Sequence, residues 1–148
     1  KFEVYLQLAE APLPQVLLRG LIDVIEFRSD GTVAVIDYKT GKHKSRNELE
    51  GGTKNATGDY KRQLDFYCIL LERAEMQAPS RLSLEFIEPD AAGKTVVHDF
   101  MYDGAAVTEL KATIHRVAGE IFTLSFMDQG CKKDDCEYCA LHELTQRD

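Results

Sequence analysis

Long apolar runs are absent from this sequence of 148 residues. No stretch approaches the ~20 apolar residues that a membrane-spanning helix requires. Residues 1–10 alternate polar and apolar side chains, as a strand does, and do not resemble a signal peptide. We therefore expect a cytoplasmic protein without a membrane partner. An initiator methionine is also absent, and we interpret the sequence as part of a longer protein.

Positive charge is scarce, because 18 Lys and Arg residues face 25 Asp and Glu residues, which gives a net charge of −7. This balance argues against a nucleic-acid partner, since DNA-binding proteins usually carry a basic surface. The distribution of charge weakens that argument, because four basic side chains gather around His43: Lys39, Lys42, Lys44 and Arg46. This cluster is either a solvated loop or a surface that contacts a nucleic-acid backbone.

Cysteines are few, and three of the four lie near the C-terminus. Cys131, Cys136 and Cys139, with His142, form the pattern C-x4-C-x2-C-x2-H. Nothing else in the sequence indicates a secreted domain stabilised by disulfides, so this spacing favours metal ligation. Zinc is one candidate, an iron–sulfur cluster is another, and free thiols are the alternative. Cys68 is predicted to pack in the core as a small apolar side chain.

The predicted elements follow the order βββαββα, which favours an α/β fold with a mixed sheet in a single domain. Alternating polarity predicts strands over residues 2–8, 16–27, 32–40, 81–87 and 95–102. Helical spacing predicts helices over residues 59–73 and 105–122, the first capped by Asp59. Turns are predicted at residues 11–14 and 29–31, and a mobile loop at residues 41–57. We assign residues 1–127 to the folded core and residues 128–148 to a cysteine-bearing tail.

The third predicted strand is apolar but ends in an acid and a base. If the hairpin folds about Asp30, Asp23 lies opposite Asp37 on the neighbouring strand. Two opposed carboxylates destabilise a sheet, unless a cation such as Mg²⁺ binds between them. Lys39 shares a face with Asp37, because side chains alternate along a strand. These residues form either a metal-dependent reaction centre, in which Lys39 acts on a water, or a structural ion pair.

The helix predicted after the loop brings polar and aromatic side chains to one face. Gln63 and Tyr67 are four residues apart, and Tyr60 lies one turn earlier. Gln63 can donate a hydrogen bond to a phosphate or to a metal-bound water. Tyr67 can stack on a base or contact a nucleic-acid backbone. The alternative is a helix packed in the core with one polar residue at its rim.

Three motifs in this order, GLID at residues 20–23, DYK at residues 37–39 and QLDFY at residues 63–67, together resemble the RecB-like branch of the PD-(D/E)XK nuclease superfamily. The resemblance covers about residues 18–67 and implies a restriction-endonuclease-like mixed sheet flanked by helices. It implies that Asp23, Asp37 and the Tyr38 carbonyl ligate a catalytic Mg²⁺ or Mn²⁺, and that Lys39 is the catalytic lysine. It also adds Gln63 and Tyr67 to the catalytic residues, as the motif that marks this branch.

The resemblance implies a metal-dependent deoxyribonuclease, an exonuclease of recombination or repair, with a helicase subunit or domain as its partner. The expected DNA contacts are Lys42, Lys44, Arg46 and Tyr60. The alternative is a nuclease-like module that binds DNA, or acts as a scaffold in a helicase complex, without catalysis.

The sequence departs from the family pattern in two places. Members of this branch usually carry a metal-ligating histidine upstream of the G-x-x-D strand, whereas His43 is the first histidine here. Relatives with an iron–sulfur cluster end in C-x2-C-x5-C, whereas Thr145 stands where the last cysteine would fall. We therefore expect this chain alone to be a weak or inactive nuclease. We also expect a cluster at the tail to need a ligand from elsewhere, which leaves zinc or free thiols as the other outcomes.

Overall fold

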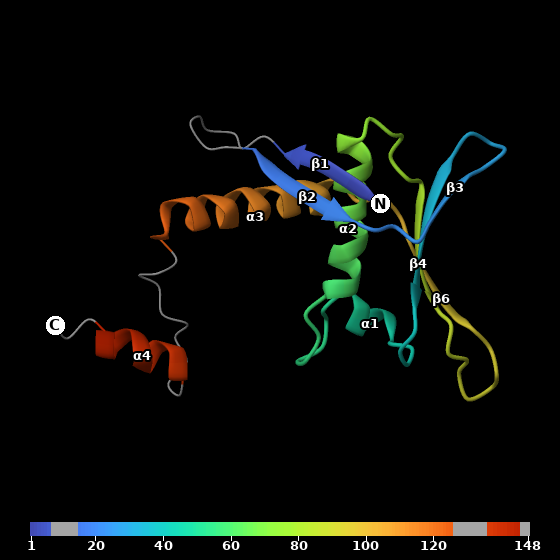
Figure 1. The fold of residues 1–148 in the computed structure, drawn as a ribbon. Helices are drawn as coiled ribbons and strands as arrows, with labels where there is room; N and C mark the ends of the chain where they lie inside the picture. The colour runs from blue at the N-terminus through green and yellow to red at the C-terminus, as the bar shows by residue number, and fades with distance from the viewer. Residues whose placement is uncertain (7–14, 126–135, 146–148) are drawn as a thin grey trace.

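The computed structural model describes residues 1–6, 15–125 and 136–145 (Figure 1). Strands β1 (Phe2–Leu6) and β2 (Val16–Gly20) form an antiparallel pair. A second sheet contains, in spatial order, β3 (Val24–Phe27), β4 (Val33–Lys39), β5 (Arg81–Phe86) and β6 (Val96–Phe100). The helices are α1 (Arg46–Leu49), α2 (Asp59–Arg73), α3 (Gly104–Thr123) and α4 (Glu137–Thr145).

The four-stranded sheet is mixed, as the sequence predicts. β3 and β4 form a hairpin around Gly31, whose φ of 83° lies in the left-handed region that glycine adopts without strain. β4 and β5 are parallel, which requires a crossover connection, and α2 lies in that connection. β6 returns antiparallel to β5. The prediction of an α/β fold with a mixed sheet is therefore confirmed.

The hydrophobic core surrounds α2. Leu64 and the run from Tyr67 to Leu71 are each no more than 3% exposed. This burial arises because the four-stranded sheet lies on one side of α2, while α3 and the β1–β2 pair lie against other parts of its surface (Figure 1). Each buried Leu or Ile contributes about 1.5–3 kcal/mol to stability. The helix that carries Gln63 and Tyr67 is therefore held firmly in place.

One predicted strand is wrong, because residues 16–27 form two strands in two different sheets. β2 ends at Gly20 and pairs with β1, whereas β3 begins at Val24 and pairs with β4. A side chain at Gly20 would collide with Leu70, which is fully buried, so the chain passes α2 closely here before it turns into the second sheet. Asp23 lies in the link between the two strands.

Two predictions near the start of α2 are also wrong. Residues 41–57 are not wholly irregular, because α1 forms within them. Ser45 and Glu48 make a reciprocal capping box there, and Leu49 is 1% exposed. The N-cap of α2 is Gly58, with a φ of 70°, and Asp59 is the first helical residue instead of the cap.

Other boundaries shift by a residue or two, as for α3, which spans Gly104–Thr123 where residues 105–122 were predicted. The turn predicted at residues 11–14 lies outside the described residues, as does the boundary at residue 127 between core and tail, which stays a prediction. Within the described ranges, every helix is too short or too polar to cross a lipid bilayer.

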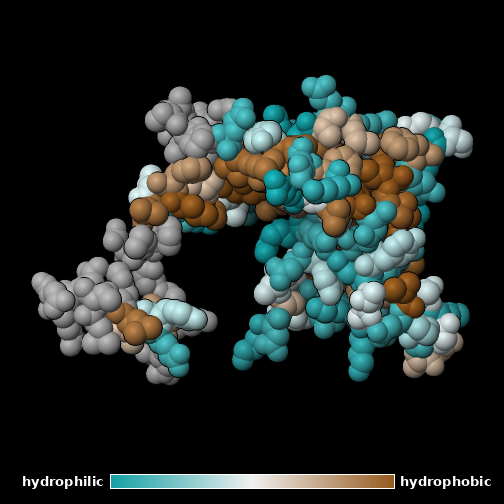
Figure 2. Space-filling model, viewed as in Figure 1, coloured by the Kyte–Doolittle hydropathy of each residue, from teal (hydrophilic) through white to brown (hydrophobic). Residues whose placement is uncertain are grey.

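Apolar side chains remain on the surface toward the C-terminal end of α3: Val117, Ile121, Phe122 and Leu124. Figure 2 shows a brown area that follows this helix, while teal side chains cover much of the remaining surface in that view. The predicted catalytic residues come from β4, α2 and the link before β3, so this apolar end of α3 does not contribute to them.

Candidate active site

The β3–β4 hairpin brings Asp23 to the end of β4. Val24 pairs with Ile36, which is the predicted register, and the ladder ends there, one pair short of Asp23 and Asp37. Asp23 instead accepts a hydrogen bond at Oδ2 from the backbone N–H of Tyr38, at 2.9 Å. The predicted proximity of Asp23 to the Asp37–Lys39 segment is therefore confirmed, with the backbone of β4 as its direct partner.

Four side chains from β4 and α2 form a closed ring of polar contacts. The Lys39 ammonium lies 2.6 Å from Asp37 Oδ2 and donates to Gln63 Oε1 at 2.5 Å. Gln63 Nε2 donates to the Tyr67 hydroxyl at 2.7 Å, and that hydroxyl donates to Asp37 Oδ1 at 2.7 Å. Asp37 and Lys39 share one face of β4, and Gln63 and Tyr67 share one face of α2, as predicted. These two faces meet each other in the structure.

Tyr67 is buried, with 3% of its surface exposed, so it cannot stack on a base as the sequence allowed. Burial raises the pKa of the Tyr67 hydroxyl, and the hydrogen bond to Asp37 and the charge of Asp37 raise it further. The hydroxyl therefore stays protonated at physiological pH and remains a donor. It fixes one oxygen of Asp37 in a defined orientation.

The other oxygen of Asp37 suits a divalent cation. Asp37 Oδ2 is buried, and its contact with Lys39 lies outside hydrogen-bonding geometry, so the atom has charge compensation but no hydrogen bond. Carboxylate oxygens are the hard ligands that Mg²⁺ and Mn²⁺ prefer. No group of three or more His, Cys, Asp or Glu side chains suited to a metal occurs among the described residues. Two carboxylates, Asp23 and Asp37, lie near the end of β4, and Mg²⁺ can be held by one or two carboxylates together with waters.

Aromatic and basic side chains lie next to Lys39. Its ammonium is 4.5 Å from the centroid of the Tyr60 ring, and that of Lys44 is 4.6 Å from the same centroid. Tyr60 also packs edge-on against Phe86, with 6.4 Å between ring centroids. Two of the predicted DNA contacts, Lys44 and Tyr60, thus lie beside the predicted catalytic lysine.

The other two predicted DNA contacts lie in different surroundings. Lys42 is exposed and lines a pocket of about 290 Å³. The Arg46 side chain pairs with Glu50 at 2.9 Å, donates to the Asp99 carbonyl at 2.7 Å and lies over the Phe100 ring. Arg46 would therefore have to leave these partners, or share them, to contact a phosphate.

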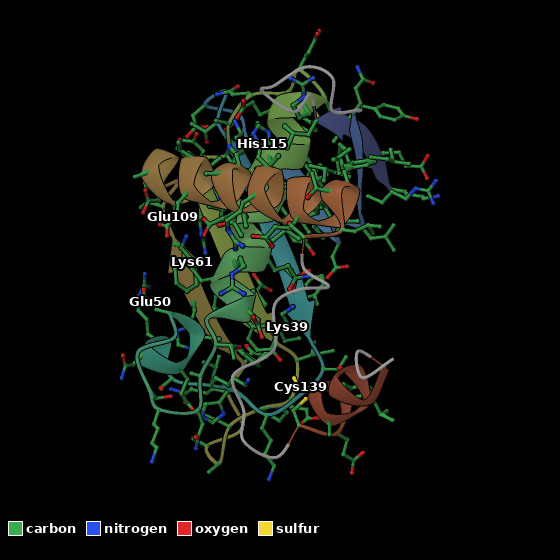
Figure 3. The ribbon with its side chains drawn as sticks, turned by 90° about the vertical axis from the view of Figure 1, so that its left-hand side faces the viewer. Lys39, Glu50, Lys61, Glu109, His115 and Cys139 are labelled. Atoms are coloured by element: carbon green, nitrogen blue, oxygen red, sulfur yellow. The ribbon has the colours of Figure 1, made fainter. Side chains whose placement is uncertain are left out.

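A larger cavity, of about 470 Å³, lies apart from these residues. Its lining comes from α2, α3 and the segment before α2, and includes Glu50, Lys61, Asp65 and Glu109. Figure 3 shows Glu50, Lys61 and Glu109 on one side of α2 and Lys39 on the other. The cavity contains none of the predicted site residues, so its size does not mark the reaction centre.

The predicted metal site at the tail is placed only in part. Cys136 and Cys139 lie at the start of α4, whereas Cys131 lies outside the described residues, and so does the side chain of His142. The zinc and iron–sulfur hypotheses therefore stay predictions. Cys68 is buried as predicted, and burial raises its pKa to about 12, which keeps the thiol protonated.

Two features of the site escaped sequence reasoning. The contact of Lys39 with the Tyr60 ring depends on how α2 is rotated, which a helical face alone does not fix. The capping box of Ser45 and Glu48, which shapes the basic segment, was present as an S-x-x-E pattern and could have been found.

An acidic residue and a lysine at the end of a central strand, braced by a crossover helix in a mixed sheet, define a nuclease-like α/β domain. The family model of the PD-(D/E)XK nuclease superfamily matches residues 1–144, and the chain belongs to this superfamily. Its fold is accordingly restriction-endonuclease-like. No curated protein matches the chain.

Proposed function

We propose that this domain is a metal-dependent deoxyribonuclease of the RecB-like branch, which hydrolyses DNA phosphodiester bonds. The closed ring of Asp37, Lys39, Gln63 and Tyr67 is the observation that carries the proposal. A purely structural ion pair would need no more than Asp37 and Lys39. The ring instead orients a buried carboxylate and an ammonium with two further side chains, which is the pre-organisation that catalysis requires.

Asp23, Asp37 and the carbonyl of Tyr38 would hold Mg²⁺ or Mn²⁺. When bound, the ion supplies a water of lowered pKa and neutralises phosphate charge. Tyr67 keeps Asp37 in the orientation that presents Oδ2, because its hydroxyl occupies Oδ1. Lys39 assists the attacking water and stabilises the negative charge that develops on the phosphate. Gln63 keeps the ammonium beside Asp37, because its amide accepts from Lys39 and donates to Tyr67.

The basic segment Lys42–Arg46, together with Tyr60, would contact the DNA backbone through charge and ring contacts that do not depend on sequence. The resemblance to the RecB-like branch supports three further proposals. The enzyme is an exonuclease of recombination or repair, a helicase subunit or domain is its partner, and the tail cysteines bind an iron–sulfur cluster or zinc.

The test compares the wild-type chain with Asp37→Ala and Lys39→Ala. Titration with Mn²⁺ should raise the melting temperature of the wild type and of Lys39→Ala, and should leave that of Asp37→Ala unchanged, because a ligand stabilises only a fold that binds it. Cleavage of linear DNA should be lost in both variants. Equal responses of all three proteins to Mn²⁺, or cleavage by Lys39→Ala at the wild-type rate, would overturn this mechanism.

A non-catalytic DNA-binding or scaffold module is the second candidate. One observation favours it: Asp23 already accepts a backbone hydrogen bond and Asp37 is already paired with Lys39, so the charges of both carboxylates have partners without a metal ion. DNA binding by a wild-type chain whose melting temperature is unchanged by Mg²⁺ and by Mn²⁺ would support this candidate over the enzyme.

A further inference from the structure

The ring of Tyr60 is in contact with two ammonium groups. Lys39 Nζ lies 4.5 Å and Lys44 Nζ lies 4.6 Å from its centroid, both within the range of a cation–π attraction. The ring itself is held from the other direction, because it packs edge-on against Phe86, which is 1% exposed. Tyr60 is thus a fixed aromatic surface that both lysines share.

Lys39 needs such a surface. An ammonium group has three N–H donors, and Asp37 and Gln63 are the polar partners of Lys39 in the ring of contacts. The lysine side chain has four flexible carbons, so two polar partners restrict the nitrogen without fixing the whole chain. An aromatic face attracts the positive charge of the ammonium without accepting a conventional hydrogen bond from it. It therefore confines the ammonium and leaves one N–H donor available to the substrate.

We propose that Tyr60 is a positioning residue, which holds the Lys39 ammonium beside Asp37 for the hydrolysis. This role rests on the proposed function and differs from the DNA contact that the sequence suggested for Tyr60. Lys44 shares the ring, so the basic segment that would contact DNA is coupled to the same aromatic surface as the catalytic lysine. Lys44 keeps the DNA contact proposed above, and its described ring contact is with Tyr60.

The first test is spectroscopic and needs no cleavage. Protons that lie over a tyrosine ring resonate upfield, so the ε-methylene signals of Lys39 should be shifted upfield in NMR spectra of the wild type. They are assigned by comparison with Lys39→Arg. The shift should persist in Tyr60→Phe and disappear in Tyr60→Leu. Lys39 signals without an upfield shift in the wild type, or with the same shift in Tyr60→Leu, would overturn the proposal.

The second test separates turnover from binding. Tyr60→Leu should lower kcat about tenfold with little change in KM, and Tyr60→Phe should retain the wild-type kcat because it keeps the ring. Lys44→Ala should raise KM, because Lys44 is a proposed DNA contact. Tyr5→Leu serves as the matched control, because Tyr5 is 55% exposed and lies on β1. It is not one of the residues in the closed ring of polar contacts, which are Asp37, Lys39, Gln63 and Tyr67.

The outcomes distinguish the two proposals. A raised KM with unchanged kcat in Tyr60→Leu would show that Tyr60 is a DNA contact and would overturn the positioning role. A wild-type chain whose melting temperature does not respond to Mn²⁺ would overturn the nuclease proposal. The upfield shift would then decide by itself whether Tyr60 positions Lys39. If Tyr60→Leu fails to fold, the spectrum of the wild type decides. An upfield shift of the Lys39 ε-methylene signals then supports the positioning role of Tyr60, and the absence of that shift overturns it.

Discussion

The Tyr67 hydroxyl orients the carboxylate of Asp37 in the proposed reaction centre, although Tyr67 itself is buried. It donates to Oδ1 at 2.7 Å and receives the amide of Gln63 at the same distance. Asp37 and Tyr67 are each only 3% exposed, whereas Gln63 is partly buried. The hydroxyl oxygen thus joins α2 to β4, the strand that carries Asp37 and Lys39.

Replacing Tyr67 by Phe should lower the free energy of unfolding by about 1–3 kcal/mol, because a buried carboxylate oxygen loses its donor. Urea denaturation measures the change. Tyr5→Phe is the matched control, since Tyr5 is 55% exposed, and it should leave stability unaltered. Equal stabilities of Tyr67→Phe and the wild type would show that the hydrogen bond is worth no more than its replacement by water.

The same hydroxyl makes stability depend on pH in the alkaline range. An exposed tyrosine in the unfolded chain ionises near pH 10, whereas burial raises the pKa of Tyr67 in the folded chain. The folded state therefore keeps a proton that the unfolded state has lost. This contribution to stability is fully present below about pH 10 and is lost as the pH rises through the folded pKa, at about 1.4 kcal/mol per pH unit. Unfolding measured from pH 9 to 11 should show a steeper fall for the wild type than for Tyr67→Phe, and parallel curves would contradict the raised pKa.

At the scale of elements, the periodicity of the sequence predicted most strands and helices, because alternation and helical spacing report burial directly. The register of the β3–β4 hairpin follows from the turn at Asp30, and this turn alone predicts that Asp23 lies near Asp37. The division of residues 16–27 into two strands could not be predicted, since it depends on a close approach of Gly20 to Leu70, far along the chain. The closed ring of polar contacts could not be predicted either, because it depends on how α2 is oriented about its axis relative to β4.

This close approach gives a test at Gly20. Gly20→Ala should lower the free energy of unfolding by about 1–3 kcal/mol, because the added methyl group enters space filled by Leu70, which is fully buried and cannot move aside freely. Gly119→Ala is the matched control. Gly119 lies inside α3 with open space around its Cα, so alanine should stabilise the helix by about 1 kcal/mol. Thermal melts decide, and a neutral Gly20→Ala would refute the packing argument.

For the whole molecule, charge sets the conditions under which DNA can bind. A net charge of −7 repels the DNA backbone, so the approach depends on the basic segment around His43. Arg46 is engaged with Glu50 and with the Asp99 carbonyl, which leaves Lys42 and Lys44 as the side chains best able to reach phosphates. Binding should therefore be weak and confined to low salt.

The dependence of DNA affinity on salt tests this distribution. Lys42→Ala and Lys44→Ala should each reduce the slope of log affinity against log salt concentration by about 1, because each removes one phosphate contact. Lys1→Ala is the control, since Lys1 lies outside the basic segment, where it pairs with Glu3 on β1, and should leave the slope unchanged. Fluorescence anisotropy between 20 and about 200 mM salt covers the useful range. An unaltered slope in both loop variants would place the DNA elsewhere on the molecule.

The closed ring of polar contacts is made by residues between Asp37 and Tyr67. The hydrogen bonds that join β4 to α2 connect residues only 24 and 30 positions apart in the sequence. During synthesis on a ribosome, a chain that has reached the end of α2 already contains every predicted catalytic side chain. It does not yet contain β5, the strand that pairs with β4 along the whole length from Ala34 to Lys39. Until β5 emerges, the backbone of β4 from Ala34 to Lys39 lacks its partner strand on that side. All the predicted catalytic side chains are therefore synthesised before the strand that holds β4 in the middle of the sheet.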